Sequence, residues 1–148
     1  MIGPAEVLTA IHIPGDPFGR DADAADDEYS RAPVSIYRKF LPRTADDYAT
    51  VAVAATVHLD RADQHCVDVR VALGAVGSTP IRARQAEDLL RGQAFDEGAI
   101  RAAAAAVQQE VDPVTDVRGS ADYKRDMAEV WVRRALMSLQ PAALARVQ

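Results

Sequence analysis

The stretch TVAVAATVHLDRADQHCVDVRVALGAV, Thr50–Val76, contains two apolar runs separated by a short polar loop. The first run, Thr50–Leu59, is β-branched and apolar on both faces, which is typical of a central, buried strand. The second run, Cys66–Val76, alternates valine and leucine with charged residues, which predicts a strand with one polar face. Residues 60–65 have the length of a hairpin loop, so we expect an antiparallel pair.

Two more strands are expected toward the N-terminus. Val34–Leu41 alternates in character and predicts a strand that a polar turn joins to the central one. EVLTAIHIP, Glu6–Pro14, also alternates and predicts a short strand that ends at Pro14. The stretch between them, Gly15–Pro33, is acidic and rich in Gly, Pro and Ala, which predicts a flexible loop.

Downstream of the strands the apolar period changes to about 3.6 residues, which indicates helices. Arg82–Gly92 predicts a short helix closed by a glycine, and Phe95–Glu110 predicts an alanine-rich helix with Asp96 as its N-cap. A last helix follows Ser120, which is expected to cap it. Strands followed by helices predict an α+β fold, in which a small antiparallel sheet of three to four strands packs against three helices.

The last helix lacks a wide polar face. At 100° per residue its apolar arc is expected to include Tyr123, Met127 and Trp131, and its polar strip to run from Asp126 to Arg133. A helix this apolar has to be covered on more than one side.

Composition excludes several classes of function. The chain has 148 residues, 49% of them hydrophobic and 26% charged, and a formal net charge of −5, which argues against nucleic-acid binding. No apolar run reaches the roughly 20 residues of a membrane span, and no secretory signal is visible. We therefore expect a cytoplasmic protein with no membrane span.

Motifs for several kinds of chemistry are missing from the sequence. Cys66 is the only cysteine, so an internal disulfide is impossible, and the three histidines do not have the spacing of metal ligands. Neither a G-x-S-x-G elbow nor a G-x-G-x-x-G or P-loop motif occurs. We expect no metal site and no catalytic residue of those kinds.

Two polar stretches have both a structural and a functional interpretation. Tyr37–Ala49 is either a solvated turn, which the residues alone favour, or a ligand edge in which a tyrosine stacks on an aromatic cofactor and basic residues contact its oxygens. Leu73–Ala83 is either a strand-to-helix turn or a place where the backbone approaches another surface. The residues concerned are Lys39, Arg43, Asp46, Asp47 and Tyr48 in the first stretch, and Gly74, Gly77 and Pro80 in the second.

Four motifs in order resemble one known family: EVLTAIHIP, IYRKFLPRTADDYATVAVA, VALGAVGSTPIRARQAEDLLRG and DVRGSADYKRDMAEVWVRRAL. Together they are similar to the C-terminal domain of the FAD-binding (medium) subunit of molybdenum hydroxylases, the relatives of carbon monoxide dehydrogenase, xanthine dehydrogenase and aldehyde oxidase. The resemblance covers nearly the whole chain except the acidic loop. Together with the patterns above, it divides the chain into an N-terminal strand and acidic flexible loop over 1–33 and an α+β flavoprotein domain over 34–148.

The resemblance also implies a cofactor site. In such enzymes FAD passes electrons from iron–sulfur clusters to an acceptor, and this domain closes one side of the FAD site. Tyr48 is then expected to lie against the isoalloxazine ring. The other cofactor-binding residues implied are Asp47, Lys39, Arg43 and Gly74.

The chain departs from the family in one respect. A full medium subunit carries glycine-rich pyrophosphate loops of the kinds G-G-x-S and T-x-G-G-N, and neither occurs here. We therefore expect weak binding of FAD by the chain alone, no activity alone, and three partners: a separate FAD-binding lobe or subunit, an iron–sulfur subunit and a molybdenum subunit. The alternatives are a non-catalytic interaction or assembly domain that keeps the fold without flavin, and a small-ligand binder at the vacant flavin edge.

Overall fold

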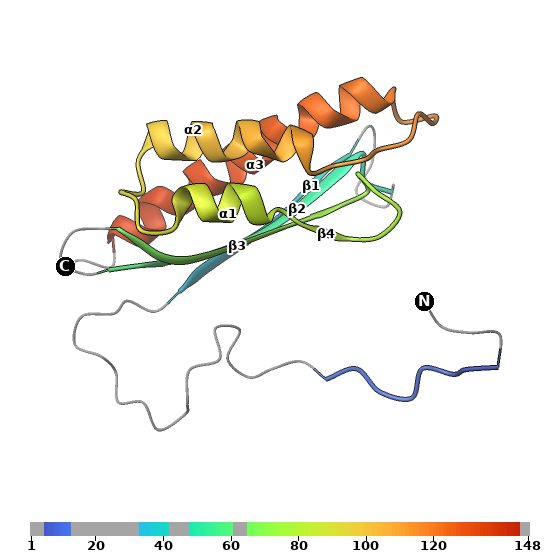
Figure 1. Ribbon diagram of the computed structural model, residues 1–148, viewed down its shortest axis with the longest axis horizontal. Helices are drawn as coiled ribbons and strands as arrows, with labels where there is room; N and C mark the ends of the chain where they lie inside the picture. The colour runs from blue at the N-terminus through green and yellow to red at the C-terminus, as the bar shows by residue number, and fades with distance from the viewer. Residues whose placement is uncertain (1–4, 13–32, 42–47, 61–64, 146–148) are drawn as a thin grey trace.

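The sheet is the scaffold of the molecule. The computed structural model describes residues 5–12, 33–41, 48–60 and 65–145. In the described residues a single sheet runs in the order β1-β2-β3-β4, with every neighbouring pair antiparallel (Figure 1). The strands are β1 (Val34–Phe40), β2 (Val51–Leu59), β3 (Cys66–Gly74) and β4 (Ile81–Arg82).

The register of the strands gives the sheet one buried and one open face. Val53 pairs with Leu73, and Val57 pairs with Val69; all four are buried. Because side chains alternate along a strand, the residue next to each of these points to the other face. Ala54, which follows Val53, is exposed on that open face.

The helices cover the buried face only. They are α1 (Arg84–Leu90), α2 (Glu97–Ala106), the 3-10 turn η1 (Val107–Gln109) and α3 (Ala121–Ala145). All lie on the same side of the sheet in Figure 1. α3 packs on β1 and β2, α1 packs on β3, and α2 packs chiefly against α1 and α3. The expected α+β arrangement of a small antiparallel sheet and three helices is confirmed.

Local signals fix the helix ends. The Asp96 carboxylate accepts a hydrogen bond from the backbone N–H of Ala99 at 2.8 Å, and the Ser120 hydroxyl accepts one from Tyr123 at 3.1 Å. Both predicted caps are therefore confirmed. Gly92, just beyond α1, has a φ of 75°, which favours glycine.

The edge of the sheet at β4 is closed by a side chain. β4 is only two residues long, so it does not pair with the whole of β3. The buried Glu87 carboxylate accepts a hydrogen bond from the backbone N–H of Val71 at 2.8 Å and one from Arg82 at 2.9 Å. Because Arg82 is held in β4, α1 begins at Arg84 and not at Arg82 as the periodicity suggested.

Two predictions about the fold are wrong. No strand exists in residues 6–12, the described part of the stretch Glu6–Pro14, and the fourth strand of the described sheet is β4 instead. A strand needs a partner for its backbone hydrogen bonds, and this segment lies apart from the sheet (Figure 1). In α3, Tyr123 is 42% exposed although it was placed in the apolar arc, and Lys124 is buried beside it.

Candidate functional site

A row of three residues crosses the open face near one end of the sheet. Lys39 of β1 pairs with Ala52 of β2, and Ala52 pairs with Gly74 of β3. Residues that pair directly lie on the same face, and Ala52 alternates with the buried Val51 and Val53. The row therefore lies on the face that the helices leave open. Ala52 and Gly74 contribute only a methyl group and a hydrogen atom to the row, and Lys39 stands at its other end.

Tyr48 lies at the same end of the sheet. It precedes β2, which is anchored there by a hydrogen bond of 2.9 Å from the backbone N–H of Thr50 to the carbonyl oxygen of Phe40. Tyr48 is 83% exposed, so its ring is open to a ligand or partner. The structure thus brings three predicted residues, Tyr48, Lys39 and Gly74, to one end of the sheet. The other two predicted residues, Asp47 and Arg43, lie outside the described residues.

The sequence analysis missed Arg118, which belongs to this end of the sheet. Its guanidinium carbon lies 5.9 Å from the centroid of the Tyr48 ring, within the range of a cation–π contact. The guanidinium also pairs with the Asp116 carboxylate at 2.8 Å. Arg118 is therefore a fixed positive charge beside the exposed tyrosine.

A buried lysine holds this arrangement. Lys124 is 2% exposed, and its ammonium group donates to Asp116 at 2.8 Å and to the carbonyl oxygen of Val114 at 2.8 Å. The hydrogen bond from Lys124, and then that from the Arg118 backbone, lower the pKa of Asp116. Asp116 and Gly119 exchange two backbone hydrogen bonds of 3.1 Å each. The turn that carries Arg118 is thus tied to the first turn of α3.

Sequence signals for this cluster existed. D-V-R-G has aspartate at the first and glycine at the fourth position of a turn, which is typical of a tight reversal. Lys124 lies in the first turn of a helix, where the helix dipole disfavours a positive charge. A lysine in such a place indicates a nearby carboxylate, and Asp116 supplies it.

Two features stand out at the end of β3 and the start of β2: a sharp turn of the backbone and a buried hydroxyl without a hydrogen-bond partner in the described residues. Ala75 follows Gly74 with a φ of 67°, an uncommon conformation for alanine that turns the chain sharply at the end of β3. Thr50 is buried, and its hydroxyl has no hydrogen-bond partner in the described part of the chain. A buried hydroxyl without a partner is costly, and its burial keeps it out of reach of a ligand in this structure.

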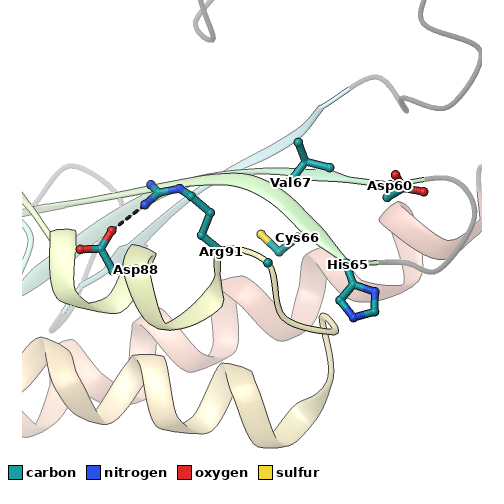
Figure 2. A pocket seen from close by; sticks show the side chains of 7 residues that line it. Asp60, His65, Cys66, Val67, Asp88 and Arg91 are labelled. Atoms are coloured by element: carbon teal, nitrogen blue, oxygen red, sulfur yellow. Dashed lines mark hydrogen bonds and ion pairs between the residues drawn. The ribbon is translucent and has the colours of Figure 1, made fainter.

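A hollow lies at the opposite end of the sheet, where α1 ends. It has a volume of about 540 Å³, and Figure 2 shows Arg91 reaching toward Asp88 beside Cys66. Burial, and then the charge of Asp68, raise the pKa of Cys66 to about 12, so the thiol is protonated and unsuited to be a nucleophile. Arg91 already pairs with Asp88 and Asp68. Because Arg91 is already paired with two carboxylates, its cation is not available to an anionic ligand.

Neither a metal site nor a membrane-spanning helix is found in the described residues. Across residues 5–12, 33–41, 48–60 and 65–145, no group of three or more His, Cys, Asp or Glu side chains is arranged to hold a metal ion. In the same residues, no helix combines the length and apolarity needed to cross a membrane.

Comparison with known proteins identifies the family. The profile of the CO dehydrogenase flavoprotein C-terminal domain matches residues 36–139, which is most of the chain. The chain therefore belongs to the family of the C-terminal domain of the FAD-binding subunits of molybdenum hydroxylases.

Individual relatives agree with this family. The carbon monoxide dehydrogenase medium chain of Afipia carboxidovorans is 38% identical over 135 residues, which cover 91% of this chain and 41% of that protein. The xanthine dehydrogenase FAD-binding subunit of Escherichia coli O157:H7 is 24% identical over 143 residues, 97% of this chain and 44% of that subunit. The solved carbon monoxide dehydrogenase of Hydrogenophaga pseudoflava superposes with a TM-score of 0.67 at 38% identity, over 77% of this chain and 37% of that one. The chain thus spans less than half of the length of these relatives.

Proposed function

We propose that this chain closes one side of an FAD site in a molybdenum hydroxylase, where electrons pass from iron–sulfur clusters to an acceptor. The observation that carries the proposal is the exposed ring of Tyr48, which lies at the same end of the sheet as the row of Lys39, Ala52 and Gly74. Membership of the flavoprotein family supports FAD as the ligand. In this proposal the flavin-binding lobe, the iron–sulfur subunit and the molybdenum subunit lie outside these 148 residues.

The residues present suit the ring system of FAD. The Tyr48 ring offers a flat aromatic surface for the isoalloxazine, and aromatic pairs of this kind favour offset stacking. Ala52 and Gly74 leave room for a large planar group to approach the sheet, because a bulky side chain is missing from both. When bound, FAD supplies the ability to accept and release electrons.

Two basic side chains have separate tasks in this proposal. Arg118 is oriented by Asp116 and lies over the Tyr48 ring, so it keeps that ring in place and adds positive charge where the flavin gains negative charge on reduction. Lys39 stands at one end of the open row, and its proposed task is to donate to a carbonyl oxygen of the ring. Asp47 and Arg43 remain proposed neighbours of the flavin.

The residues present do not suit the pyrophosphate of FAD. The sequence has no glycine-rich loop of the two family kinds. We therefore expect the purified chain to stay colourless when it is mixed with FAD, whereas the complex with a flavin-binding lobe is yellow. Tight binding of FAD by the chain alone would contradict this part of the proposal.

Tyr48 is tested in that complex. The tagged chain is purified from its own cells together with the products of neighbouring genes, and the flavin spectrum and rate of flavin reduction are measured. Tyr48→Ala should alter both while leaving the complex assembled, and Tyr48→Phe should retain the stacking and most of the wild-type behaviour. Tyr37→Ala is the matched control, because Tyr37 is also an exposed tyrosine but lies two residues before Lys39 in β1, where it pairs with Ala54 and not with Ala52. An unchanged flavin in Tyr48→Ala would rule out this residue as a flavin contact.

The same purification separates the second candidate, an assembly domain without flavin. That function is favoured if the chain forms a stable complex that has no visible flavin absorbance. The exposed apolar residues near the N-terminus are the observation that keeps this candidate open.

A further inference from the structure

Lys124 is a charged residue in a place where neither burial nor the helix favours a charge. It is 2% exposed, and it lies in the first turn of α3, where the positive end of the helix dipole disfavours a cation. An apolar residue of similar volume is often at least as stabilising as a buried ion pair. The ion pair of Lys124 with Asp116 is therefore better explained by the orientation it imposes than by the stability it adds.

The Asp116 carboxylate uses both of its oxygens. Its Oδ1 accepts a hydrogen bond from the Lys124 ammonium at 2.8 Å and one from the backbone N–H of Arg118 at 2.8 Å. Its Oδ2 accepts a hydrogen bond from the Arg118 guanidinium at 2.8 Å. Because a carboxylate is planar, the two bonds to Oδ1 fix the direction in which Oδ2 points. Lys124 thus helps to determine where the Arg118 guanidinium lies.

Arg118 in turn restrains Tyr48. Its guanidinium carbon lies 5.9 Å from the centroid of the Tyr48 ring. The ring is 83% exposed, and exposed side chains change rotamer within picoseconds to nanoseconds unless a contact holds them. A guanidinium that a carboxylate already holds loses less side-chain entropy in such a contact than a mobile one.

We propose that Lys124 is a positioning residue for Tyr48. It acts through Asp116 and Arg118, and it holds the tyrosine ring where the flavin is expected to stack. The inference rests on the proposed function and deepens it, since it extends the flavin site from an exposed ring to a buried residue of α3. Without the buried ammonium, the Asp116 carboxylate loses a bond that sets its direction, Arg118 gains freedom, and the ring is released.

Fluorine NMR of the isolated chain tests these contacts without flavin. The chain is labelled with 3-fluorotyrosine at its four tyrosines, and Tyr48→Phe identifies the signal of Tyr48. Arg118→Gln should shift this signal, because the cation leaves the face of the ring. Lys124→Met removes the charge but keeps an unbranched side chain, and it should shift the signal in the same direction. The double variant should show little or no additional shift, and the Tyr37 signal should stay in place in all of them.

Three further variants separate positioning from a purely structural role. Arg125→Gln is the matched control, because Arg125 is the next cation in α3 but pairs with Asp122 at 3.0 Å, so the Tyr48 signal should not move. Lys124→Arg retains a cation and should restore most of the wild-type signal position. Asp116→Asn keeps the size of the side chain and should shift the Tyr48 signal as Lys124→Met does. It takes the place of Lys124→Met if that variant does not fold.

The consequence for the flavin is measured in the complex purified from the chain's own cells. Lys124→Met should slow flavin reduction by at least about threefold, which corresponds to a modest coupling between contacting residues, while the complex still assembles. In a Tyr48→Ala background the same substitution should not slow reduction further, because the ring that it positions is gone. Lys124→Arg should recover most of the wild-type rate.

The possible results separate this inference from the proposed function. A Tyr48 signal that moves in Arg118→Gln but in neither Lys124→Met nor Asp116→Asn overturns the inference and leaves Lys124 with a structural role. An effect of Lys124→Met on flavin reduction that persists in the Tyr48→Ala background also overturns it. The expected shifts in the isolated chain, together with an unchanged flavin in Tyr48→Ala, support the chain of contacts and overturn the proposed flavin contact.

Discussion

Replacing Gly74 and Gly119 by alanine, one at a time, should change stability in opposite directions. Both glycines lie at the end of the sheet where Tyr48 is exposed. They differ in backbone conformation: Gly119 has a φ of 147°, which L side chains rarely adopt, and Gly74 has no such restriction. They also differ in the space around them. A Cβ at Gly74 would lie 3.6 Å from the Cβ of Ala52, whereas one at Gly119 would lie 2.6 Å from the Tyr123 ring.

The magnitudes follow from these two differences. Gly74→Ala fits its site, so it should raise the free energy of unfolding by about 0.4–1 kcal/mol through the lower entropy of the unfolded chain. Gly119→Ala is strained in its backbone and contacts an aromatic ring too closely, so it should lower the free energy of unfolding by about 1–3 kcal/mol. At about 3 °C per kcal/mol for a chain of this size, the two melting temperatures should lie at least about 4 °C apart.

Urea and thermal unfolding of the purified chain, followed by circular dichroism, measure both effects. Destabilisation by Gly74→Ala of more than about 1 kcal/mol would refute the reasoning, because it would mean that the space beside Ala52 is already filled. A third variant, Gly74→Leu, connects the result to function. It should leave the isolated chain folded, since its side chain points away from the helices, but it should reduce flavin absorbance in the complex.

Two further predictions concern single side chains. Burial raises the pKa of Cys66 from 9.0 to about 12, so between these values the unfolded chain loses a proton that the folded chain keeps. The stability that the thiol contributes is complete below about pH 9 and decreases above it by up to about 1.4 kcal/mol per pH unit, so wild type should lose stability relative to Cys66→Ala between pH 9 and 11. A difference that is constant with pH would contradict the shift. Asp96→Ala should lower the free energy of unfolding by about 1 kcal/mol, because the Ala99 N–H loses its acceptor. Asp96→Asn retains an acceptor and should be close to wild type in the same urea titration.

Features that depend on neighbouring residues could be predicted from the sequence. The strands around residues 60–65 and the caps at Asp96 and Ser120 follow from patterns within a few residues, and all of them are confirmed. The strand at Glu6–Pro14 has an equally good pattern but is absent from its described part. Its failure has a physical reason: alternation shows that a segment suits a sheet, but a strand forms only where an edge is available to pair with it.

The error in α3 has a different origin. The apolar arc follows from hydrophobicity alone, which includes Tyr123 and gives no reason to bury Lys124. In the structure Lys124 is buried because the preceding turn supplies Asp116 and the carbonyl oxygen of Val114. Periodicity along a helix cannot predict a partner that a loop provides. The same turn brings Arg118 to Tyr48, so the missed lysine and the missed site residue have one cause.

The predicted site follows from the resemblance, and the register of the sheet shows that two of its residues, Lys39 and Gly74, lie in one row. Lys39 and Gly74 are 35 positions apart in the numbering but lie on either side of Ala52. Sequence patterns that predict strands do not predict which residues pair across them, because a shift by one residue moves every side chain to the other face. The row on the open face therefore could not have been derived from the strands alone.

The interactions at this end of the sheet also set a limit on what the chain can contribute to FAD binding. An aromatic stack provides about 0.5–1.5 kcal/mol beyond the area it buries, and each hydrogen bond from a charged group provides about 1.5–3 kcal/mol. Apart from the area that the stack buries, one stack at Tyr48 with single bonds from Lys39 and Arg118 would amount to at most about 7.5 kcal/mol, before the cost of immobilising the ligand is subtracted. A micromolar dissociation constant requires about 8.2 kcal/mol. If the proposed function is correct, most of the affinity for FAD has to come from the lobe that binds its pyrophosphate, and the part of this chain is to orient and cover the ring.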